Sequence, residues 1–471
     1  MAPIIKTQLV VIGGGPGGYA AAFHAADHNM ETVLVDLEEN PGGVCLYRGC
    51  IPSKALLHAA KLLEDAKEAK SIGLDFGKPK IDIDKLRDWK ASVVKKLTGG
   101  LGMLAKQRKI NYVRGRAEFV DNNNLLIKTP DNKEQKLTFE QAILASGSRA
   151  SLIPGLPIES PHVWNSKLAL DLPEVPASLL IIGGGYIGLE MGCVYAALGT
   201  TVTVVEMTDT ILPGCDSDLS RILLARLKKQ FTAIHLNTKV AEVKDNGQGV
   251  SVVLEGQESG ARQFDKVLVS VGRRPNTEKL GLENTKLQVG ADGFVVVDPQ
   301  RRTHELNIFA IGDVAGQPML AHKASAEGKL AVDVIAGKKA LWEPRAIPAV
   351  VFTDPEIAWA GMMEADAQAA GLDVIVTKFP WAASGRALTL GRSDGVTKLV
   401  CAKATGRIVG IGIAGPQAGD LITEGVLAIE MGAVAEDLHL SIHPHPTLSE
   451  TVMEAAELVY GPATHYYGGK R

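Results

Sequence analysis

The sequence predicts an α/β protein with two Rossmann-like dinucleotide-binding units and a C-terminal α+β domain. Two observations carry this prediction. A glycine motif that directly follows an apolar strand occurs twice, whereas residues 348–471 lack such a motif and mix β-rich runs with helical stretches. With 471 residues, the chain is long enough for about three or four domains.

The first unit begins with the apolar run 8–12, which we interpret as a buried parallel strand. Gly13, Gly15 and Gly18 follow at once, and an Ala-rich helical stretch leads to a second strand that ends in Asp36. In this pattern the first glycine allows a tight turn, the second lets the backbone approach a pyrophosphate, and the third lets the helix pack on the strand. Asp36 is then placed to accept hydrogen bonds from ribose hydroxyls.

The second unit repeats this pattern 170 residues later. An apolar run at 179–182 precedes Gly183, Gly185 and Gly188, and the following strand ends in Glu206. One such motif is weak evidence, but two in strand–turn–helix context, each with an acidic residue 18 positions past its last glycine, predict two nucleotide sites.

Cys45 and Cys50 lie between these units and suggest a redox disulfide. On a regular helix their spacing directs the side chains about 140° apart, so a bond requires a distorted turn, which Gly49 permits. The helical pattern from Pro52 onward places Cys50 at a helix N-terminus, where the dipole favours a thiolate. Two unpaired core cysteines are the alternative interpretation of this spacing alone.

Charge and composition exclude several classes of function. The 50 basic and 53 acidic residues give a net charge of −3, so nothing favours a nucleic acid or an anionic membrane as partner. We expect no signal peptide at residues 1–18 and no membrane span. With only five cysteines, the chain fits a reducing compartment, and we expect a cytoplasmic protein. The sequence suggests no metal-binding residues.

The remaining segments complete the domain plan. The run from Thr303 to Asp313 is interpreted as a strand that delivers a carboxylate into a turn. In the C-terminal part we expect strands at 349–352, 373–379, 397–402 and 408–413 and a helix at 418–431.

Taken together, these motifs resemble the flavin disulfide reductases from end to end, and most closely the dihydrolipoamide dehydrogenases. The matching phrases are Gly49–Leu57, Gly185–Glu190, Gly312–Asp313 and His445–Glu450. The resemblance implies FAD on the first motif and on the segment ending at Asp313, NAD on the second motif, and a homodimer. The implied domains are 1–150 for FAD binding, 151–271 for NAD binding, 272–347 for completing the FAD site and 348–471 for dimerisation.

The resemblance also assigns catalytic residues. His445 is the base for the incoming thiol, and Glu450 orients it. Thr447 and Glu450 also form a capping-box pattern, so Glu450 has a structural alternative, and His443 is the fallback base. Because the family brings the base and the cysteines together across a two-fold axis, each active site is expected to be shared between subunits.

Further residues are expected near the flavin. The resemblance places Lys54 beside the flavin, paired with Glu190, and adds Gly147 and Gly272 to the cofactor-binding residues. Two departures from the family pattern stand out, namely Tyr47-Arg48 inside the redox motif and Pro444 before the base. The remaining cysteines, Cys193, Cys215 and Cys401, are interpreted as packing residues.

The implied reaction is oxidation of protein-bound dihydrolipoamide by NAD+, in which a substrate thiolate attacks Cys45 while Cys50 holds electrons beside the flavin. The partners would be lipoyl domains and the acyltransferase core subunit of 2-oxo-acid dehydrogenase complexes, or the glycine cleavage system. Glu206 would repel a 2′-phosphate and so favours NAD over NADP. The alternatives are an NADPH-dependent reductase of the glutathione type, against which Glu206 and Ser53-Lys54 argue, and a mainly structural peripheral subunit.

Overall fold

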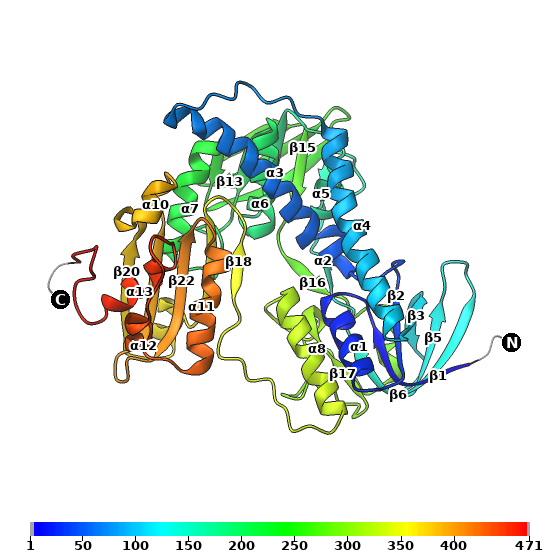
Figure 1. Ribbon diagram of the computed structural model, residues 1–471. Coiled ribbons are helices and arrows are strands. Elements are labelled where there is room, and N and C mark those ends of the chain that lie inside the picture. The colour runs from blue at the N-terminus through cyan, green and yellow to red at the C-terminus, as the bar shows by residue number, and fades with distance from the viewer. Residues whose placement is uncertain (1–3, 469–471) are drawn as a thin grey trace.

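A seven-stranded sheet forms the first unit of the computed structural model, which describes residues 4–468 (Figure 1). Strands β3, β2, β1, β6 and β17 are parallel, and β5 and β4 continue the sheet antiparallel beyond β6. Their bounds are β1 Ile5–Ile12, β2 Thr32–Asp36, β3 Asn111–Arg114, β4 Arg116–Phe119, β5 Asn124–Lys128, β6 Glu134–Leu144 and β17 Ile308–Ala310. The predicted strand within 303–313 is present but shorter, because the chain makes a turn at residues 305–308 before it and Gly312–Val314 forms a 3-10 turn, η3, after it.

Two helices pack side by side on one face of this sheet. They are α1 (Pro16–Asp27), which follows β1, and α8 (Ala321–Ile335), which comes from much later in the chain (Figure 1). Their close approach depends on small residues, because a Cβ on Gly328 would lie 2.6 Å from the carbonyl oxygen of Gly17.

The second unit has a five-stranded parallel sheet in the order β11-β10-β9-β15-β8. Its elements are β8 Val163–Trp164, α5 Ser166–Asp171, β9 Ser178–Ile182, α6 Tyr186–Leu198, β10 Thr201–Val205, α7 Ser217–Gln230, β11 Ala233–His235 and β15 Lys266–Val269. An antiparallel sheet of β12 (Thr238–Asp245), β13 (Val250–Gly256) and β14 (Gly260–Phe264) adjoins it.

The duplication extends to single hydrogen bonds. In the first unit the Gly42 N–H donates to the Gly14 carbonyl over 2.7 Å, and in the second the Leu212 N–H donates to the Gly184 carbonyl over 2.9 Å. Both pairs differ by the same 170 residues as the glycine motifs. The two parallel-sheet units predicted from the repeat are thus confirmed.

Helices and a short ladder connect the two units. The helices are α2 Gly43–Arg48, α3 Cys50–Glu68, η1 Ala69–Ile72 and α4 Ile83–Gln107, and α3 packs on α6. The ladder pairs β7 (Ser148–Ala150) with β16 (Arg273–Pro275), and η2 (Leu282–Asn284) follows. This arrangement places the cysteine segment between the two nucleotide-binding units.

The C-terminal part is an antiparallel sheet with helices, in the order β18-β19-β22-β21-β20. Its elements are β18 Ala349–Val351, β19 Glu356–Gly361, α9 Glu364–Ala369, β20 Val374–Pro380, η4 Trp381–Ala383, α10 Gly385–Thr389, β21 Val396–Ala402, β22 Ile408–Gly415, α11 Ala418–Met431, α12 Ala435–Leu440 and α13 Glu450–Glu457. The four predicted strands and the helix at 418–431 are present. The sequence analysis missed β19, which pairs with strands on both sides.

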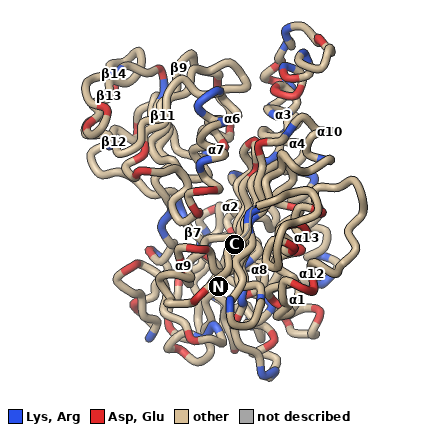
Figure 2. The backbone as a smooth tube through the Cα atoms, turned by 90° about the vertical axis from the view of Figure 1, so that its left-hand side faces the viewer, with Lys and Arg blue, Asp and Glu red and all other residues tan. Residues whose placement is uncertain are grey.

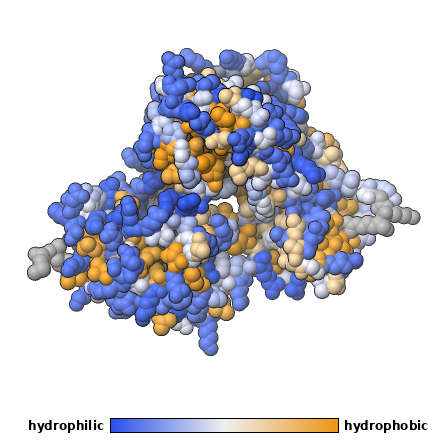
Figure 3. Space-filling model, turned by 180° about the vertical axis from the view of Figure 1, so that it is seen from behind, coloured by the Kyte–Doolittle hydropathy of each residue, from blue (hydrophilic) through white to orange (hydrophobic). Residues whose placement is uncertain are grey.

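Charges of both signs are mixed over the surface. Basic and acidic residues are interspersed along the backbone (Figure 2), and apolar residues reach the surface in patches on the rear face (Figure 3). Within residues 4–468, none of the helices has the length and apolarity needed to cross a bilayer.

Candidate active site

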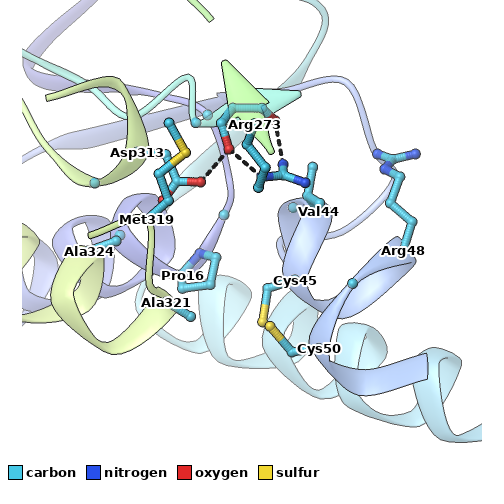
Figure 4. A pocket seen from close by; sticks show the side chains of 18 of the residues that line it. Pro16, Val44, Cys45, Arg48, Cys50, Arg273, Asp313, Met319, Ala321 and Ala324 are labelled. Carbon is cyan, nitrogen blue, oxygen red and sulfur yellow. Dashed lines mark hydrogen bonds between the residues drawn. The ribbon is translucent and has the colours of Figure 1, made fainter. Parts of the chain in front are cut away.

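A cavity of about 370 Å³ lies where the first sheet, the cysteine helices and α6 meet (Figure 4). Its lining residues include Asp36, Gly13, Gly15, Cys50 and Lys54. A cavity that is lined both by a phosphate-binding turn and by a redox pair combines the features that a flavin dinucleotide site requires.

The first glycine motif forms the cradle of this cavity. A Cβ on Gly13, whose φ is +106°, would lie 2.3 Å from the Ala145 carbonyl oxygen, and one on Gly18 would lie 1.7 Å from the Gly13 carbonyl oxygen. Gly15 is the N-cap of α1, so the free N–H groups of that helix face the cavity. Gly13 and Gly18 therefore leave no room for a Cβ, as the motif predicted, whereas a Cβ on Gly15 would meet only the Gly43 Cα, at 3.9 Å.

Asp36 ends β2 and is held in place by backbone donors. Its carboxylate accepts hydrogen bonds from the N–H groups of Gly14 and, over 2.8 Å, of Glu38. Burial raises the pKa of Asp36 above its usual range, while these two hydrogen bonds oppose the rise. A carboxylate has about four lone-pair sites, so acceptor capacity remains for ribose hydroxyls.

The two cysteines sit on different helices, separated by a break at Gly49. Cys45 lies in α2 and Cys50 is the first residue of α3. A Cβ on Gly49 would lie 2.9 Å from the Val44 carbonyl oxygen, so the break requires glycine. Both cysteines are free thiols, and their sulfur atoms point toward each other (Figure 4). The predicted distortion at Gly49 is therefore confirmed and brings the pair together.

The surroundings make the two sulfurs unequal. The hydrogen bond from the Cys45 thiol lowers the pKa of Cys50 to about 7, and the Lys54 ammonium acts in the same direction. The same hydrogen bond raises the pKa of the Cys45 thiol, and burial raises it further. Of the two sulfurs, Cys50 is therefore the one that ionises more readily.

Lys54 and Glu190 form the ion pair that the family resemblance implied. The Lys54 ammonium lies 2.9 and 3.1 Å from the two carboxylate oxygens of Glu190, which is only 3% exposed. Glu190 also accepts the Phe352 N–H over 3.0 Å, and the Lys54 ammonium lies 4.4 Å from the centre of the Phe352 ring. Three distant segments thereby hold the Lys54 ammonium at the wall of the cavity.

Asp313 is anchored by two residues that the sequence analysis missed. The Ser148 hydroxyl donates to the Asp313 carboxylate, and the Arg273 guanidinium donates to the hydroxyl and carbonyl oxygens of Ser148, each over 2.8 Å (Figure 4). Gly147 lines the cavity beside them, whereas Gly272 only precedes Arg273 in the chain. No motif marks Ser148 and Arg273, because the β7–β16 ladder alone brings them together.

The second glycine motif has the same geometry as the first. A Cβ on Gly183 would lie 2.6 Å from the Ser270 carbonyl oxygen, and a Cβ on Gly188 would lie 2.5 Å from the Gly183 carbonyl oxygen. Gly185 is the N-cap of α6. Glu206 accepts the Gly184 N–H over 2.7 Å and the Thr208 N–H over 2.8 Å, as Asp36 accepts its own pair.

The two nucleotide sites meet at the start of α6. Tyr186 and Ile187 directly follow the second glycine motif, yet both line the first cavity together with Cys50. Tyr186 was not singled out in the sequence. Tyr186 therefore comes from the second glycine motif but lines the cavity of the first.

His445 and Glu450 form a pair away from the cavity. The Nδ1 atom of His445 lies 2.9 Å from one Glu450 oxygen, and the other oxygen accepts the Thr447 N–H over 2.7 Å. Glu450 therefore makes the contacts that both alternatives require. The Thr447 hydroxyl donates instead to the Pro444 carbonyl, so the capping box is half formed. His445 is 71% exposed, and neither His445 nor Glu450 lines the cavity.

The fallback base His443 and the remaining cysteines do not line the cavity. The side chain of His443 is 7% exposed and bonded to Glu424 over 2.7 Å. Cys215 and Cys401 are buried, and burial raises the pKa of each to about 12. Cys193 lies on α6, and burial also raises its pKa.

The unusual Tyr47-Arg48 pair fastens the cysteine helix to the loop after β2. The Tyr47 hydroxyl donates to the Asn40 carbonyl over 3.0 Å, and Arg48 forms an ion pair with Glu38. Arg48 and Glu38 both line the cavity. These contacts hold α2, and with it Cys45, against the nucleotide-binding unit.

Comparisons with known proteins agree with this geometry. Residues 7–328 match the family described as pyridine nucleotide-disulphide oxidoreductase, and residues 347–456 match the dimerisation domain of that family. Dihydrolipoyl dehydrogenases of Vibrio cholerae and Bacillus subtilis are 48% and 46% identical to the chain, and each alignment covers 98% of both proteins.

Solved structures are similar over nearly the whole chain. The structure of LpdA from Mycobacterium tuberculosis has a TM-score of 0.88 and 26% identity, with 96% of this chain and 99% of that one covered. RclA from Escherichia coli, described as an HOCl-induced flavoprotein disulfide reductase, has a TM-score of 0.86 and 28% identity, with 96% and 100% covered.

Proposed function

The chain belongs to the pyridine nucleotide-disulphide oxidoreductase family, and within it to the dihydrolipoyl dehydrogenases, and from that premise we propose how its residues divide the reaction. The protein oxidises dihydrolipoamide to lipoamide and reduces NAD+ to NADH, with FAD and NAD(H) as cofactors. The alternative of a glutathione-type reductase is not favoured.

The cavity fits FAD, and the observation that carries this fit is the glycine cradle. The Gly13–Gly18 turn would hold the pyrophosphate, Asp36 the ribose, and Asp313 the part of the dinucleotide between the cradle and the cysteines. Lys54 would lie beside the ring system. When bound, FAD supplies the hydride chemistry that passes electrons from the thiols to NAD+.

The cysteines and His445 carry out the thiol steps. With Cys45 and Cys50 as a disulfide, a substrate thiol gives its proton to His445, and the thiolate attacks the Cys45 sulfur. The Cys45–Cys50 bond breaks, and Cys50 leaves as a thiolate, which its lowered pKa favours. The second substrate thiol then displaces Cys45, so that lipoamide leaves as a disulfide and the enzyme keeps two electrons on its dithiol.

We propose that Glu450 stabilises the protonated form of His445. The 2.9 Å contact between Nδ1 and the Glu450 carboxylate leaves Nε2 free to take the proton. Burial opposes ionisation of Glu450, but the Thr447 N–H and the imidazole outweigh it and lower the pKa of this carboxyl group. Glu450 is therefore a carboxylate at neutral pH.

The protein is a homodimer through its C-terminal domain. Large apolar side chains support this on the structural side, since Leu427 and Met431 on α11 and Leu440 on α12 are each more than 60% exposed. Because His445 is exposed and does not line the cavity, we propose that it completes the active site of the partner subunit.

We further propose the nucleotide preference and the partners. Glu206, a buried carboxylate at the end of β10, would select NAD by repelling a 2′-phosphate. Lipoyl domains and the core of a 2-oxo-acid dehydrogenase complex are the proposed partners, in the cytoplasm. The four proposed domains are those with boundaries at 150, 271 and 347.

An anaerobic titration tests the reaction. Dihydrolipoamide should reduce the holoenzyme, and NAD+, but not NADP+ at the same concentration, should then reoxidise it. Oxidised glutathione with NADPH is the matched control. Turnover in the control, or no reduction by dihydrolipoamide, would contradict the proposed function.

A further inference from the structure

We propose that His24, His28 and Asp333 form a binding site for a divalent transition-metal ion, at the end of α1 remote from the glycine cradle. One ligand atom from each of these three residues lies within 4.8 Å of the other two. The Nε2 atoms of both imidazoles converge on the same Asp333 oxygen, at 2.9 Å for His24 and 3.8 Å for His28. The site is separate from the redox chemistry and does not depend on the proposed function.

The distances suit direct coordination. Bond lengths of about 2.0–2.1 Å in a tetrahedral zinc site place neighbouring ligand atoms about 3.3 Å apart, and the two observed distances lie on either side of that value. His24 and His28 are one helical turn apart and so lie on one face of the helix. The third ligand comes from α8, which packs along α1, and water would fill the remaining position.

The hydrogen bonds prepare the imidazoles for a metal. The Nδ1 of His28 lies 2.9 Å from the His24 carbonyl oxygen and must donate to it, so the lone pair of the His28 ring is on Nε2. The Nε2 of His24 donates to Asp333 in the absence of metal, and a bound ion would replace that proton.

Burial and ligand chemistry define the class of ion. The three side chains are 25%, 27% and 27% exposed, so the site is partly shielded but open to an ion from solvent. Two imidazoles and one carboxylate favour Zn²⁺, Co²⁺, Ni²⁺ or Cu²⁺ over Mg²⁺ and Ca²⁺, which prefer oxygen ligands.

Lys338 would compete with a metal ion for the Asp333 carboxylate. Its ammonium lies 2.8 Å from the same Asp333 oxygen that the imidazoles approach. A divalent ion must displace this ammonium from that oxygen or bind against its charge. Removing the lysine should therefore tighten metal binding, whereas removing either histidine should abolish it.

Cobalt titration of the untagged, oxidised holoenzyme tests the site, because the catalytic cysteines are then a disulfide and offer no thiolate. We expect one Co²⁺ per chain, with visible absorbance beyond that of the flavin and displacement by Zn²⁺. His24→Gln and His28→Gln should each weaken binding at least tenfold, and Lys338→Gln should tighten it several-fold. FAD content reports the folding of each variant.

His162→Gln is the matched control. His162 lies 3.2 Å from Asp245 and is also an imidazole–carboxylate pair, but the pair has no second imidazole, so its loss should leave Co²⁺ binding unchanged. Binding that survives in both His24→Gln and His28→Gln, or that disappears equally in His162→Gln, would overturn the assignment. So would weaker binding in Lys338→Gln.

Discussion

At the scale of single residues, the two redox cysteines differ because their surroundings differ. Cys50 starts α3, accepts a hydrogen bond from Cys45 and precedes Lys54 by one helical turn. Each of these features favours a negative charge on its sulfur. Cys45 donates the hydrogen bond and remains a neutral thiol. From this asymmetry we propose that Cys50 faces the flavin and that Cys45 exchanges with the substrate.

The ionisation of Cys50 predicts a pH-dependent spectrum. A thiolate in contact with oxidised flavin gives long-wavelength absorbance, so the partly reduced enzyme should show this band above the Cys50 pKa of about 7 and lose it below. Lys54→Gln should move the midpoint to higher pH, because a cation that stabilises the thiolate is gone. Absorbance titrations between about pH 5.5 and pH 9 measure both midpoints.

Serine variants provide the controls for this titration. Cys50→Ser should lack the band at every pH, whereas Cys45→Ser should keep it even without reductant. Identical behaviour of the two variants would show that the roles of the cysteines are assigned wrongly.

At the scale of elements, one buried lysine joins the second nucleotide-binding unit to the C-terminal sheet. Lys398 on β21 is 1% exposed and lies 2.6 Å from Asp216, 2.9 Å from Asp218 and 2.8 Å from Glu364. Asp216 and Asp218 belong to the start of α7, and Glu364 starts α9. Burial alone would lower the pKa of Lys398, but the three carboxylates outweigh it and raise it.

Lys398→Met should therefore destabilise the protein strongly. Three carboxylates would lose their shared cation, which costs about 3–5 kcal/mol for a buried pair that loses one partner. Urea unfolding measures the change. Lys403→Met, which removes an exposed partner of Asp373, is the control and should cost at most about 1 kcal/mol.

At acidic pH, the difference in the free energy of unfolding between wild type and Lys398→Met should become smaller. Burial raises the pKa of Asp218, but the hydrogen bonds from Lys378 and Lys398 outweigh it, so the folded-state pKa lies below the unfolded one. The stabilisation is thus present above the unfolded pKa and is lost as the pH falls through the folded pKa. A difference that stays constant down to about pH 3 would contradict this account.

At the scale of the whole molecule, the two halves of the proposed active site do not meet within one chain. The cysteines line the cavity between the nucleotide-binding units, whereas His445 is exposed on the C-terminal domain. A two-fold dimer can unite the halves, because each subunit then offers its histidine to the cavity of the other.

Mixing two inactive variants tests this sharing. His445→Gln and Cys45→Ser, combined under conditions that exchange subunits, should regain activity approaching about a quarter of wild type, since half of the dimers carry one intact site of two. Activity assays with native mass spectrometry follow recovery and exchange together. Full exchange without any recovery would show that each site lies within one subunit.

The sequence by itself determined the features that depend on neighbouring residues. The two glycine motifs, the acidic residues that follow them, the break at Gly49 and the His445–Glu450 pair all lie within short segments. Their geometry follows from local backbone sterics, from helix periodicity and from hydrogen bonds over a few residues. For this reason the fold class, both parallel-sheet units and the helix break at Gly49 could be predicted from the chain alone.

Only the tertiary structure decided which distant residues meet. Ser148 and Arg273 reach Asp313 through a ladder between segments 125 residues apart, and Phe352 reaches Glu190 from 162 residues away. Likewise β19 is a strand because β18 and β22 flank it, although its small residues give a weak strand pattern. His24 and Asp333 meet for the same reason. Such contacts depend on how helices and sheets pack against one another. Packing involves the whole chain, so a local sequence pattern cannot predict these contacts.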